Sequence, residues 1–472
     1  MTPIDLEQLR ARFRGELITP SEGARYDAAR AVFNGMFDRR PALIARATGT
    51  ADVIAALAFT REHGLPLAVR GGGHSVAGYS CIDDGVVIDV GAMKGIRVQP
   101  AARRARVQAG VNWGELDRET QAFGLATTGG RMTTTGVSGF TLGSGSGWME
   151  RLHGLACDNL LSADVVTADG RLLTASPTEN EDLFWGLRGG GGNFGIVTEF
   201  EFQLHPVGPI VLGGMILHPA DKARELYRFY RDFMQSAPPE LGGGIVYLTA
   251  PPAPFVPPAL QGRPAVAIIV AWFGALDRGQ AVLAPLRAFG SPPVDMVQPM
   301  PYLLLQSLTD AGNPPGRRNY WRSENLSALP DDAIEALLAR AETATSPFTV
   351  MILVPSGGAV AAVAEDATPL GGRSAPWQYH CYGSWVGGDD AGHIAWVRET
   401  EQALRPWTSG RMSLNFISEA NNDRVRAAFG EEKYGRLVAL KDKYDPTNLF
   451  RMNQNVPPSA SASADTSAPR SV

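Results

Sequence analysis

Two different spacings of hydrophobic residues alternate along the first 208 residues and predict interleaved strands and helices. The strand-like spacing occurs in five short apolar runs, at 65–69, 85–90, 104–111, 160–170 and 195–206. The last run has an apolar face and a polar face, formed by Ile196, Phe200, Phe202 and Leu204 on one side and Glu199, Glu201 and Gln203 on the other. Residues 51–64 instead follow a helical spacing, with Val53, Ile54 and Leu57 on one face, and end at Gly64.

The pattern changes at about residue 209. Strand-like runs such as IVLGGMILHP, PAVAIIVAWFG and WQYHCYGSWVG then follow one another as far as residue 412, separated by helical or proline-rich connections. This predicts a second domain built on one sheet. Residues 413–458 return to a helical pattern with an extended end, and residues 459–472 have the Ser- and Ala-rich composition of a disordered tail.

Composition limits the class of partner. A chain of 472 residues has room for two or three domains, and 44% hydrophobic with 19% charged residues is typical of a globular protein. The formal net charge is -5 and no block of Lys or Arg occurs, which argues against a nucleic-acid surface. We therefore expect a small-molecule partner.

The cysteines and the N-terminus indicate in which cellular compartment the protein is expected. Cys81, Cys157 and Cys381 are odd in number, far apart and without CxxC spacing, so we expect neither a disulfide framework nor a metal site. The N-terminus lacks the apolar core of a signal peptide, and no run approaches the ~20 apolar residues of a membrane span. These features predict a cytoplasmic protein without a membrane partner.

Three glycine-rich segments point to a phosphate-bearing cofactor. They are RGGGHSVAG (70–78), TTTGVSGFTLGSGSGW (133–148) and RGGGGNFGIV (188–197), which expose backbone N–H donors with no Cβ atoms in the way. One such loop is as often a tight turn with a solvated histidine, but three suggest a large cofactor lying across them. Gly190, Gly192 and Gly195 fit GxGxxG, yet a helical segment precedes them and a strand follows, so a Rossmann site is disfavoured.

The order of these motifs resembles a known family. RGGGHSVAGYS, GVVIDV, GVSGFTLGSGSGW, GLACDNLLSADVVTADG, DLFWGLRGGGGNFGIVTEF and KYDPTNLFRMNQNVPP together resemble the berberine-bridge-enzyme-like FAD-linked oxidases of the vanillyl-alcohol oxidase superfamily. The resemblance implies an α+β fold. A PCMH-type FAD-binding domain would comprise residues 1–208 and 413–458, and residues 209–412 would form an inserted substrate-binding domain, an antiparallel sheet covered by helices.

The resemblance also implies FAD bonded covalently, through its 8α-methyl carbon, to His74. Such a link fixes the ring and withdraws electron density from it, which favours accepting hydride. Further FAD contacts are expected at residues of the matching motifs, namely Arg70, Gly71, Gly72, Gly73, Ser75, Val76, Gly78, Tyr79, Gly129, Thr133, Thr134, Gly136, Gly139, Gly143, Gly147, Cys157, Asn159, Gly192, Gly195, Val197, Asn453 and Asn455.

Many relatives carry a second link through a cysteine four residues before the first glycine of a GVGG-like motif. Counting back from Gly136 gives Met132, which cannot form that link. Cys157 lies downstream, at a position where relatives often have a small residue, and is interpreted as a packed structural residue whose backbone borders the cofactor. We therefore expect a single link, through His74.

The catalytic base of several relatives is a tyrosine in a YxN[FY] motif, and this chain has Ser413, Leu414, Asn415 and Phe416 there. Period-two alternation in WQYHCYGSW puts Gln378, His380 and Tyr382 on one face, which resembles the substrate-facing strand of the family. Tyr320, in GRRNYWRS, is another candidate. The alternative is that His380 and Tyr382 are ordinary sheet-surface residues and Tyr320 is a packed aromatic.

The chain is thus predicted to move hydride from a small organic substrate to covalently bound FAD, with O2 reoxidising the flavin to give H2O2. In relatives the residue before Gly136 borders the approach of oxygen to the flavin, and the resemblance therefore implies that the small Thr135 favours oxygen reactivity. A same-fold dehydrogenase with another acceptor, a carbohydrate oxidase and a flavin-binding protein without turnover are alternatives. Tailoring of a secondary metabolite is favoured over sugar oxidation, because the second link and the usual base are missing. Aromatic residues of the inserted domain, Trp272, Tyr247, Tyr320 and Trp377, could line a pocket for any of these substrates, and the oligomeric state stays open.

Overall fold

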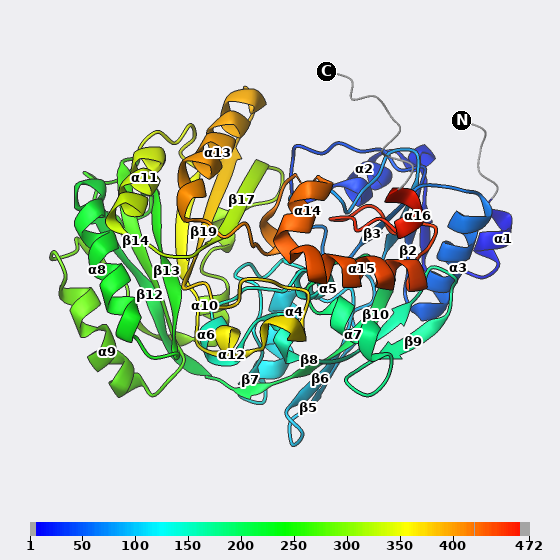
Figure 1. The fold of residues 1–472 in the computed structure, drawn as a ribbon, viewed down its shortest axis with the longest axis horizontal. Helices are drawn as coiled ribbons and strands as arrows, with labels where there is room; N and C mark the ends of the chain where they lie inside the picture. The colour runs from blue at the N-terminus through cyan, green and yellow to red at the C-terminus, as the bar shows by residue number, and fades with distance from the viewer. Residues whose placement is uncertain (1–5, 420, 463–472) are drawn as a thin grey trace.

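The chain folds into two parts of mixed helix and strand that lie side by side (Figure 1). The computed structural model describes residues 6–419 and 421–462. One part holds a four-stranded and a five-stranded sheet from the first 203 residues, and the other holds an eight-stranded sheet from residues 210–385. The α+β class expected from the sequence is confirmed.

The four-stranded sheet presents the first glycine loop. Its strands lie in the order β1 (Glu16–Ile18), β2 (Leu43–Arg46), β4 (Val86–Asp89), β3 (Leu67–Arg70), and β4 is parallel to both neighbours. The predicted helix is α3 (Thr50–Glu62), which buries Val53 and Leu57 in the core beneath the sheet. Because β3 ends at Arg70, the three glycines that follow leave the carboxyl end of a buried strand.

The five-stranded sheet is antiparallel and presents the third glycine segment. Its order is β5 (Ile96–Gln99), β6 (Arg104–Gln108), β10 (Ile196–Gln203), β8 (Leu160–Val166), β9 (Leu172–Ala175). The alternation predicted for β10 is confirmed, since Phe200 and Phe202 are buried while Glu199 and Glu201 pair with arginines of β6. Its first residue, Ile196, directly follows Gly195, the last glycine of that segment.

Short elements complete the first part. They are α1 (Glu7–Arg10), α2 (Ala24–Arg30), α4 (Trp113–Gln121), β7 (Leu125–Ala126), α5 (Val137–Leu142), α6 (Glu150–His153), the 3-10 turn η2 (Ala156–Asn159), α7 (Glu181–Leu187) and β11 (His205–Pro206), which pairs with β7. Helix α5 begins directly after Gly136, so the second glycine segment runs from a loop into a helix.

The C-terminal segment returns to the first part. Helices α14 (Asn422–Phe429) and α15 (Glu431–Tyr444) pack into the same hydrophobic core as the strands of that part. The ammonium of Lys441 is buried, where it pairs with Asp445 at 2.8 Å and donates to the backbone oxygen of Asn193 at 2.9 Å. The short helix α16 (Ser459–Ala462) begins the predicted disordered tail, and the rest of that tail lies outside the described residues.

The second part is one antiparallel sheet with helices on its outer face (Figure 1). The strands are β12 (Ile210–Pro219), β13 (Leu241–Thr249), β14 (Pro264–Trp272), β15 (Val294–Asp295), β16 (Gln298–Pro301), β17 (Arg318–Leu326), β18 (Val350–Pro355) and β19 (Trp377–Trp385). Their order is β15-β12-β14-β13-β18-β19-β17, with β16 paired to β12. The helices on the outer face are α8 (Ala223–Ser236), α9 (Leu276–Ala288), α11 (Asp331–Ala341) and α13 (Asp390–Leu404). The short helices α10 (Tyr302–Gln306) and α12 (Ala359–Ala362) instead contact α4 and α6 of the first part.

The two faces of this sheet have different neighbours. Ile245, Ile268 and Leu353 form a core with residues of α8, α11 and α13. The opposite face approaches the first part so closely that a Cβ atom on Gly242 would lie 1.9 Å from the backbone oxygen of Trp148. The glycines of β13 therefore permit the contact between the two parts, and the functional site lies where they meet.

Candidate active site

A cavity of about 480 Å³ lies between the glycine loops and the inner face of the eight-stranded sheet. All three glycine segments contribute to its wall, together with strands β13, β14, β18 and β19 and the C-terminal segment. Of the residues selected from the sequence, those that line it are Gly71, Gly72, Gly73, His74, Ser75, Val76, Tyr79, Gly136, Gly139, Gly143, Gly192, Gly195, Val197, Asn453, His380 and Tyr382.

The glycine loops touch through their backbones. A Cβ atom on Gly72 would lie 2.4 Å from the nitrogen of Gly136, and one on Gly136 would lie 2.4 Å from the nitrogen of Gly72. Asn453, from the C-terminal segment, donates to the oxygen of Gly192 at 2.9 Å, while its buried Oδ1 has no hydrogen-bond partner in the described part of the chain. Backbone without Cβ atoms and an unused buried acceptor suit the pyrophosphate and hydroxyl groups of FAD, so the residues present fit this cofactor.

His74 sits at the end of the first glycine loop with its ring held on two sides. The ring stacks on Phe33, with centroids 4.2 Å apart, and Nε2 lies 2.8 Å from Oγ1 of Thr134. Burial lowers the pKa of His74 to about 4, partly offset by Asp310. The imidazole is therefore neutral near pH 7, and among the described residues no hydrogen bond reaches Nδ1.

Several predicted FAD contacts do not line the cavity and hold the loops instead. Arg70 forms a buried ion pair with Asp89 at 2.9 Å, and Thr133 donates its backbone N–H to Asp310 at 2.9 Å. Thr134 reaches the cavity only through His74. The others in this group are Gly78, whose Cβ would meet the Phe37 ring, Gly129 and Gly147, which are in backbone contact, and Asn159, bonded to the oxygens of His153 and Leu155. Asn455 also lies outside the cavity lining, and within the described residues its buried Oδ1 has no hydrogen-bond partner.

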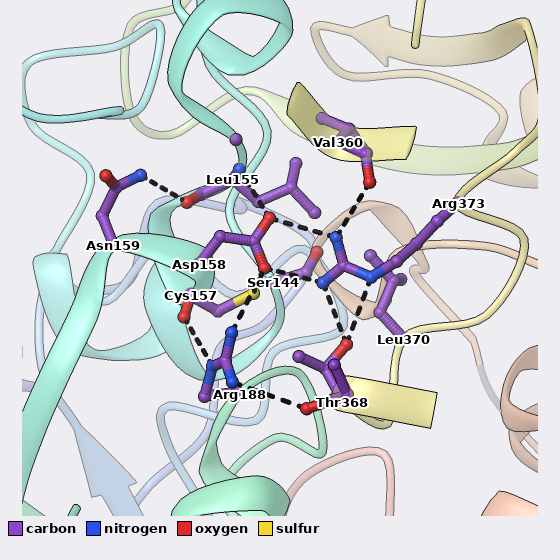
Figure 2. Close-up of polar contacts among 12 residues, drawn as sticks. Ser144, Leu155, Cys157, Asp158, Asn159, Arg188, Val360, Thr368, Leu370 and Arg373 are labelled. Atoms are coloured by element: carbon purple, nitrogen blue, oxygen red, sulfur yellow. Dashed lines mark hydrogen bonds and ion pairs between the residues drawn. The ribbon is translucent and has the colours of Figure 1, made fainter. Parts of the chain in front are cut away.

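Cys157 lies in a buried network outside the cavity (Figure 2). Its side chain packs in a small apolar cluster with Leu155, Val360 and Leu370, and burial raises the pKa of its thiol. Its backbone N–H donates to the oxygen of Ser144, and its carbonyl accepts from Arg188, both at 3.0 Å. This environment favours the structural interpretation of Cys157, and Cys157 does not line the cavity, while its backbone contact with the cofactor stays a prediction.

On the substrate side, His380, Tyr382 and Ser384 of β19 line the cavity. His380 is 1% exposed, and neither ring nitrogen has a hydrogen-bond partner among the residues that the structure describes. Burial, helped by Arg131, lowers its pKa to about 3. Tyr382 stacks on Trp321 with ring centroids 4.2 Å apart. Gln378 is on the same side of the strand but does not line the cavity.

Four aromatic residues proposed as pocket-lining lie on the other face of the sheet. Tyr320, Tyr247, Trp272 and Trp377 belong to the core under the helices. The Tyr320 hydroxyl donates to Glu419 at 2.6 Å and accepts from Arg322 at 2.7 Å. These residues do not line the cavity, so the expectation that they line a pocket is wrong, and Tyr320 is no longer a candidate base.

Ser413, at the position of the usual base, is also turned away from a substrate. Its hydroxyl lies 2.8 Å from that of Ser144 and 3.2 Å from the oxygen of Gly143. Asn415 accepts from the backbone N–H of Gly145 at 3.1 Å. Both residues therefore fasten the second glycine segment to the C-terminal segment.

The structure adds cavity residues that the sequence did not single out. Trp321 and Asn319 alternate with Tyr320 on β17 and face inward, and Phe416 lies 4.6 Å from His380 between ring centroids. The guanidinium of Arg131 stacks over Trp148 and pairs with Glu150 at 3.6 Å. Met132 and Thr135, which are already picked out from the sequence, also line the cavity. Strand alternation could have found Trp321, but it does not indicate which face is covered.

The described part of the chain has neither a metal-binding cluster nor a membrane-spanning helix. Within residues 6–419 and 421–462, no group of three or more His, Cys, Asp or Glu side chains could hold a metal ion. No helix in these residues is both long and apolar enough to span a bilayer.

Comparison with known proteins gives the family. Residues 41–176 match the model of an FAD binding domain, and residues 413–457 match the family described as berberine and berberine like. The chain is 31% identical over 462 residues to (R)-6-hydroxynicotine oxidase of Paenarthrobacter nicotinovorans, covering 95% of this chain and 98% of that protein. It is 30% identical over 424 residues to an FAD-linked oxidoreductase of Dictyostelium discoideum, covering 89% of each.

Solved structures agree in fold. The crystal structure of 6-hydroxy-D-nicotine oxidase from Arthrobacter nicotinovorans superposes with a TM-score of 0.84 at 29% identity, over 94% of this chain and 98% of that chain. Chitooligosaccharide oxidase superposes with a TM-score of 0.83 at 24% identity, over 96% and 98% of the two chains, which is a likeness of fold. The chain therefore belongs to the berberine-bridge-enzyme-like FAD-linked oxidases and is an FAD-binding oxidoreductase.

Proposed function

We propose that this enzyme oxidises a small organic substrate by taking hydride into FAD held through a single covalent link at His74, and that O2 then accepts the electrons to give H2O2. In this proposal residues 1–208 and 413–458 hold the cofactor, and residues 209–412 supply the substrate side. FAD supplies a two-electron acceptor that protein side chains lack. The chain itself positions the cofactor, excludes water and accepts a proton.

The state of His74 supports a single link at its ring. The imidazole is neutral and stacked on Phe33, and the contact of Nε2 with Thr134 leaves Nδ1 available for a bond. A thioether cannot replace the thiol of a second link, and Met132 occupies that position on the cavity wall. Cys157 is packed away in its own buried cluster.

His380 is the proposed proton acceptor, and its unpartnered burial is the observation that carries the catalytic proposal. A buried imidazole with both nitrogens unpaired is costly unless a ligand completes its hydrogen bonds. Burial lowers its pKa to about 3, so the ring is neutral at physiological pH and is a weak base. Its free lone pair can accept a hydrogen bond from a substrate hydroxyl or amine, and the proton follows as departure of the hydride makes that group strongly acidic. Tyr382, whose ring centroid lies 5.6 Å from that of His380, limits the ring's motion.

The covalent link is tested by acid precipitation of the purified holoenzyme, followed by the visible spectrum of the pellet. Wild type and Cys157→Ala should keep the yellow colour, and His74→Ala should lose it. Colour that persists in His74→Ala would disprove the link at this residue. Because Cys157→Ala truncates a fully buried side chain outside the cavity, it controls for loss of flavin through a general disturbance of the FAD-binding part.

Turnover and the electron acceptor require a second assay. A panel of alcohols, amines and sugars is mixed with the enzyme without oxygen, and bleaching of the flavin is recorded. A substrate that bleaches the flavin excludes a protein without turnover. Rapid recovery of the colour with air, together with H2O2, supports an oxidase. Slow recovery with air but fast recovery with a dye would instead identify a dehydrogenase. In His380→Gln, bleaching should slow by about 10²-fold or more, as for loss of a catalytic base.

A further inference from the structure

The inner face of the eight-stranded sheet carries aliphatic side chains that nothing in the described chain fully covers. Val246, Ile269 and Ile352 are partly exposed within the cavity wall. Their neighbours along the same strands, Ile245, Ile268 and Leu353, are 0% exposed on the opposite face. An apolar floor that stays partly open inside a cavity is suited to an apolar ligand.

The floor has a direction, which follows from the strand register. Ala267 of β14 is opposite Val246 of β13, Val246 is opposite Ile352 of β18, and Ile352 is opposite His380 of β19. An aliphatic row therefore crosses three strands and ends at the proposed proton acceptor. A ligand aligned with this row would rest its apolar body on the floor and bring one end to His380.

The cavity offers no counter-charge for a cationic ligand. Among the described residues that line it, none is Asp, Glu or Lys, and the cation Arg131 lies on the wall. Arg131 donates to the oxygen of Gly147 at 3.3 Å and to the hydroxyl of Ser146 at 3.1 Å, in addition to its pair with Glu150. An ammonium group placed here would lose its water with no carboxylate to compensate, which is strongly unfavourable.

Few polar groups remain free for a ligand with many hydroxyls. The Asn319 side chain donates to the oxygen of Arg317 at 2.8 Å and accepts from the indole of Trp321 at 3.3 Å. Asn313 donates to the oxygen of Thr309 at 2.8 Å. Among the described residues that line the cavity on the side of the sheet, the polar groups that remain free are mainly the side chains of β19. A sugar bound here would therefore bury most of its hydroxyls without hydrogen-bond partners.

We propose that the substrate is an uncharged alcohol with one polar end and an extended apolar body, which lies on the floor with its hydroxyl against β19. This inference rests on the proposed function. The carbinol C–H bond breaks and its electron pair leaves as hydride to FAD, the O–H proton passes to His380, and a C=O bond forms. O2 takes the two electrons and two protons and leaves as H2O2. This class differs from the nicotine derivative and the oligosaccharide that the names of two relatives indicate.

The test is ligand binding to the holoenzyme without oxygen, read from the shift of the flavin visible spectrum. The probes are linear 1-alkanols from butanol to octanol, with cellobiose and phenethylammonium as polar and cationic comparisons. Each added methylene should lower Kd about fourfold, the effect of burying one CH2 group. Cellobiose and phenethylammonium should give no saturable shift at a hundred times the Kd of octanol.

Two variants of the floor check the location. Val246→Thr keeps the shape but adds a hydroxyl, and should raise the Kd of octanol at least fivefold. Ile352→Asp should abolish octanol binding and make phenethylammonium bind. Val386→Asp adds the same charge at a residue that is 70% exposed just after β19, and should leave both affinities unchanged.

The outcomes separate this inference from the proposed function. Kd values that do not vary with chain length, saturable binding of cellobiose or phenethylammonium to the wild type, or a Val246→Thr variant that binds octanol normally would each overturn the alcohol class. Flavin bleaching by a sugar would overturn the alcohol class but uphold turnover. Chain-length-dependent binding with no bleaching by any alcohol would uphold the floor as an apolar binding site and refute turnover.

Discussion

Removing the guanidinium of Arg373 should destabilise the protein far more than removing an exposed arginine. The Arg373 side chain is 2% exposed and that of Asp158 is 5% exposed, and two hydrogen bonds of 2.7 and 3.1 Å join them (Figure 2). Arg373 also donates to Oγ1 of Thr368 at 2.9 Å. In Arg373→Met, the carboxylate of Asp158 would stay buried without its main partner.

The expected loss of unfolding free energy depends on the contacts that Asp158 keeps in Arg373→Met. Loss of one partner from a buried ion pair costs about 3–5 kcal/mol of unfolding free energy. The backbone N–H of Leu155, at 3.0 Å, and Arg188, at 3.7 Å, still stabilise the charge, so we expect the lower end, about 3 kcal/mol. The matched control is Arg171→Met, which breaks a 2.6 Å pair with Asp169 whose side chains are 61% and 50% exposed. That loss should be at most about 1 kcal/mol.

The assay is urea unfolding of the holoenzyme followed by tryptophan fluorescence, with wild type, Arg171→Met, Arg373→Met, Asp158→Leu and the double variant Asp158→Leu/Arg373→Met. The double variant should lose less unfolding free energy than the two single variants lose together, because it leaves no unpaired buried charge. An Arg373→Met variant no less stable than Arg171→Met, or additive losses in the double variant, would refute the reasoning. Because residues 356–376 connect β18 to β19, this pair also fastens the strand that carries His380 to the FAD-binding part.

Three further predictions concern the site itself. Thr134→Val should reduce the fraction of covalently bound flavin, seen as in-gel fluorescence, because His74 loses the contact that orients its ring; an unchanged fraction would deny Thr134 that role. Cys157→Ser should leave this fraction unchanged, and a loss would reinstate Cys157 as a link. Lowering the pH from 7 to 4.5 should destabilise the wild type more than His380→Gln by about 2–3 kcal/mol, measured by urea unfolding. His380, with a folded pKa of about 3, stays neutral there while the unfolded histidine takes up a proton, so its contribution is present above pH 6.5 and is lost as the pH falls toward 3. Equal acid sensitivity of the two proteins would contradict that pKa.

The glycine loops could be predicted from the sequence because their signal is local. A glycine that contacts backbone, as Gly72 does at Gly136, is needed for steric reasons wherever the loops meet. Strand β17 could not be predicted in the same way, since RNYWRSENL is mostly polar. It is buried because distant residues supply partners, such as Glu419 for Arg322 and Arg424 for Glu324. Such partners are invisible in a local pattern.

Strand alternation predicted which residues share a face but not which face is covered. It grouped His380 with Tyr382, and both line the cavity. The same rule separates Tyr320 from Trp321, yet nothing local in GRRNYWRS indicates that helix α13 covers the face of Tyr320. Neighbouring residues of a strand point to opposite faces of the sheet. Only the packing of the helices therefore decides which of the two aromatic residues is covered and which lines the cavity.

The chemistry of His380 depends on that packing in a further way. On an exposed strand its imidazole would titrate near pH 6.5 and be partly protonated at neutral pH. The approach of the two parts, made possible by glycines such as Gly242, buries the ring beside Phe416 and Arg131, and this lowers its pKa to about 3. The contact that encloses the cavity thus also keeps His380 neutral and able to accept a proton. A variant that separates the parts, such as Gly242→Val, should therefore raise the pKa of His380 toward 6.5 as well as loosen the flavin, and NMR titration of a ring-labelled histidine would detect the change.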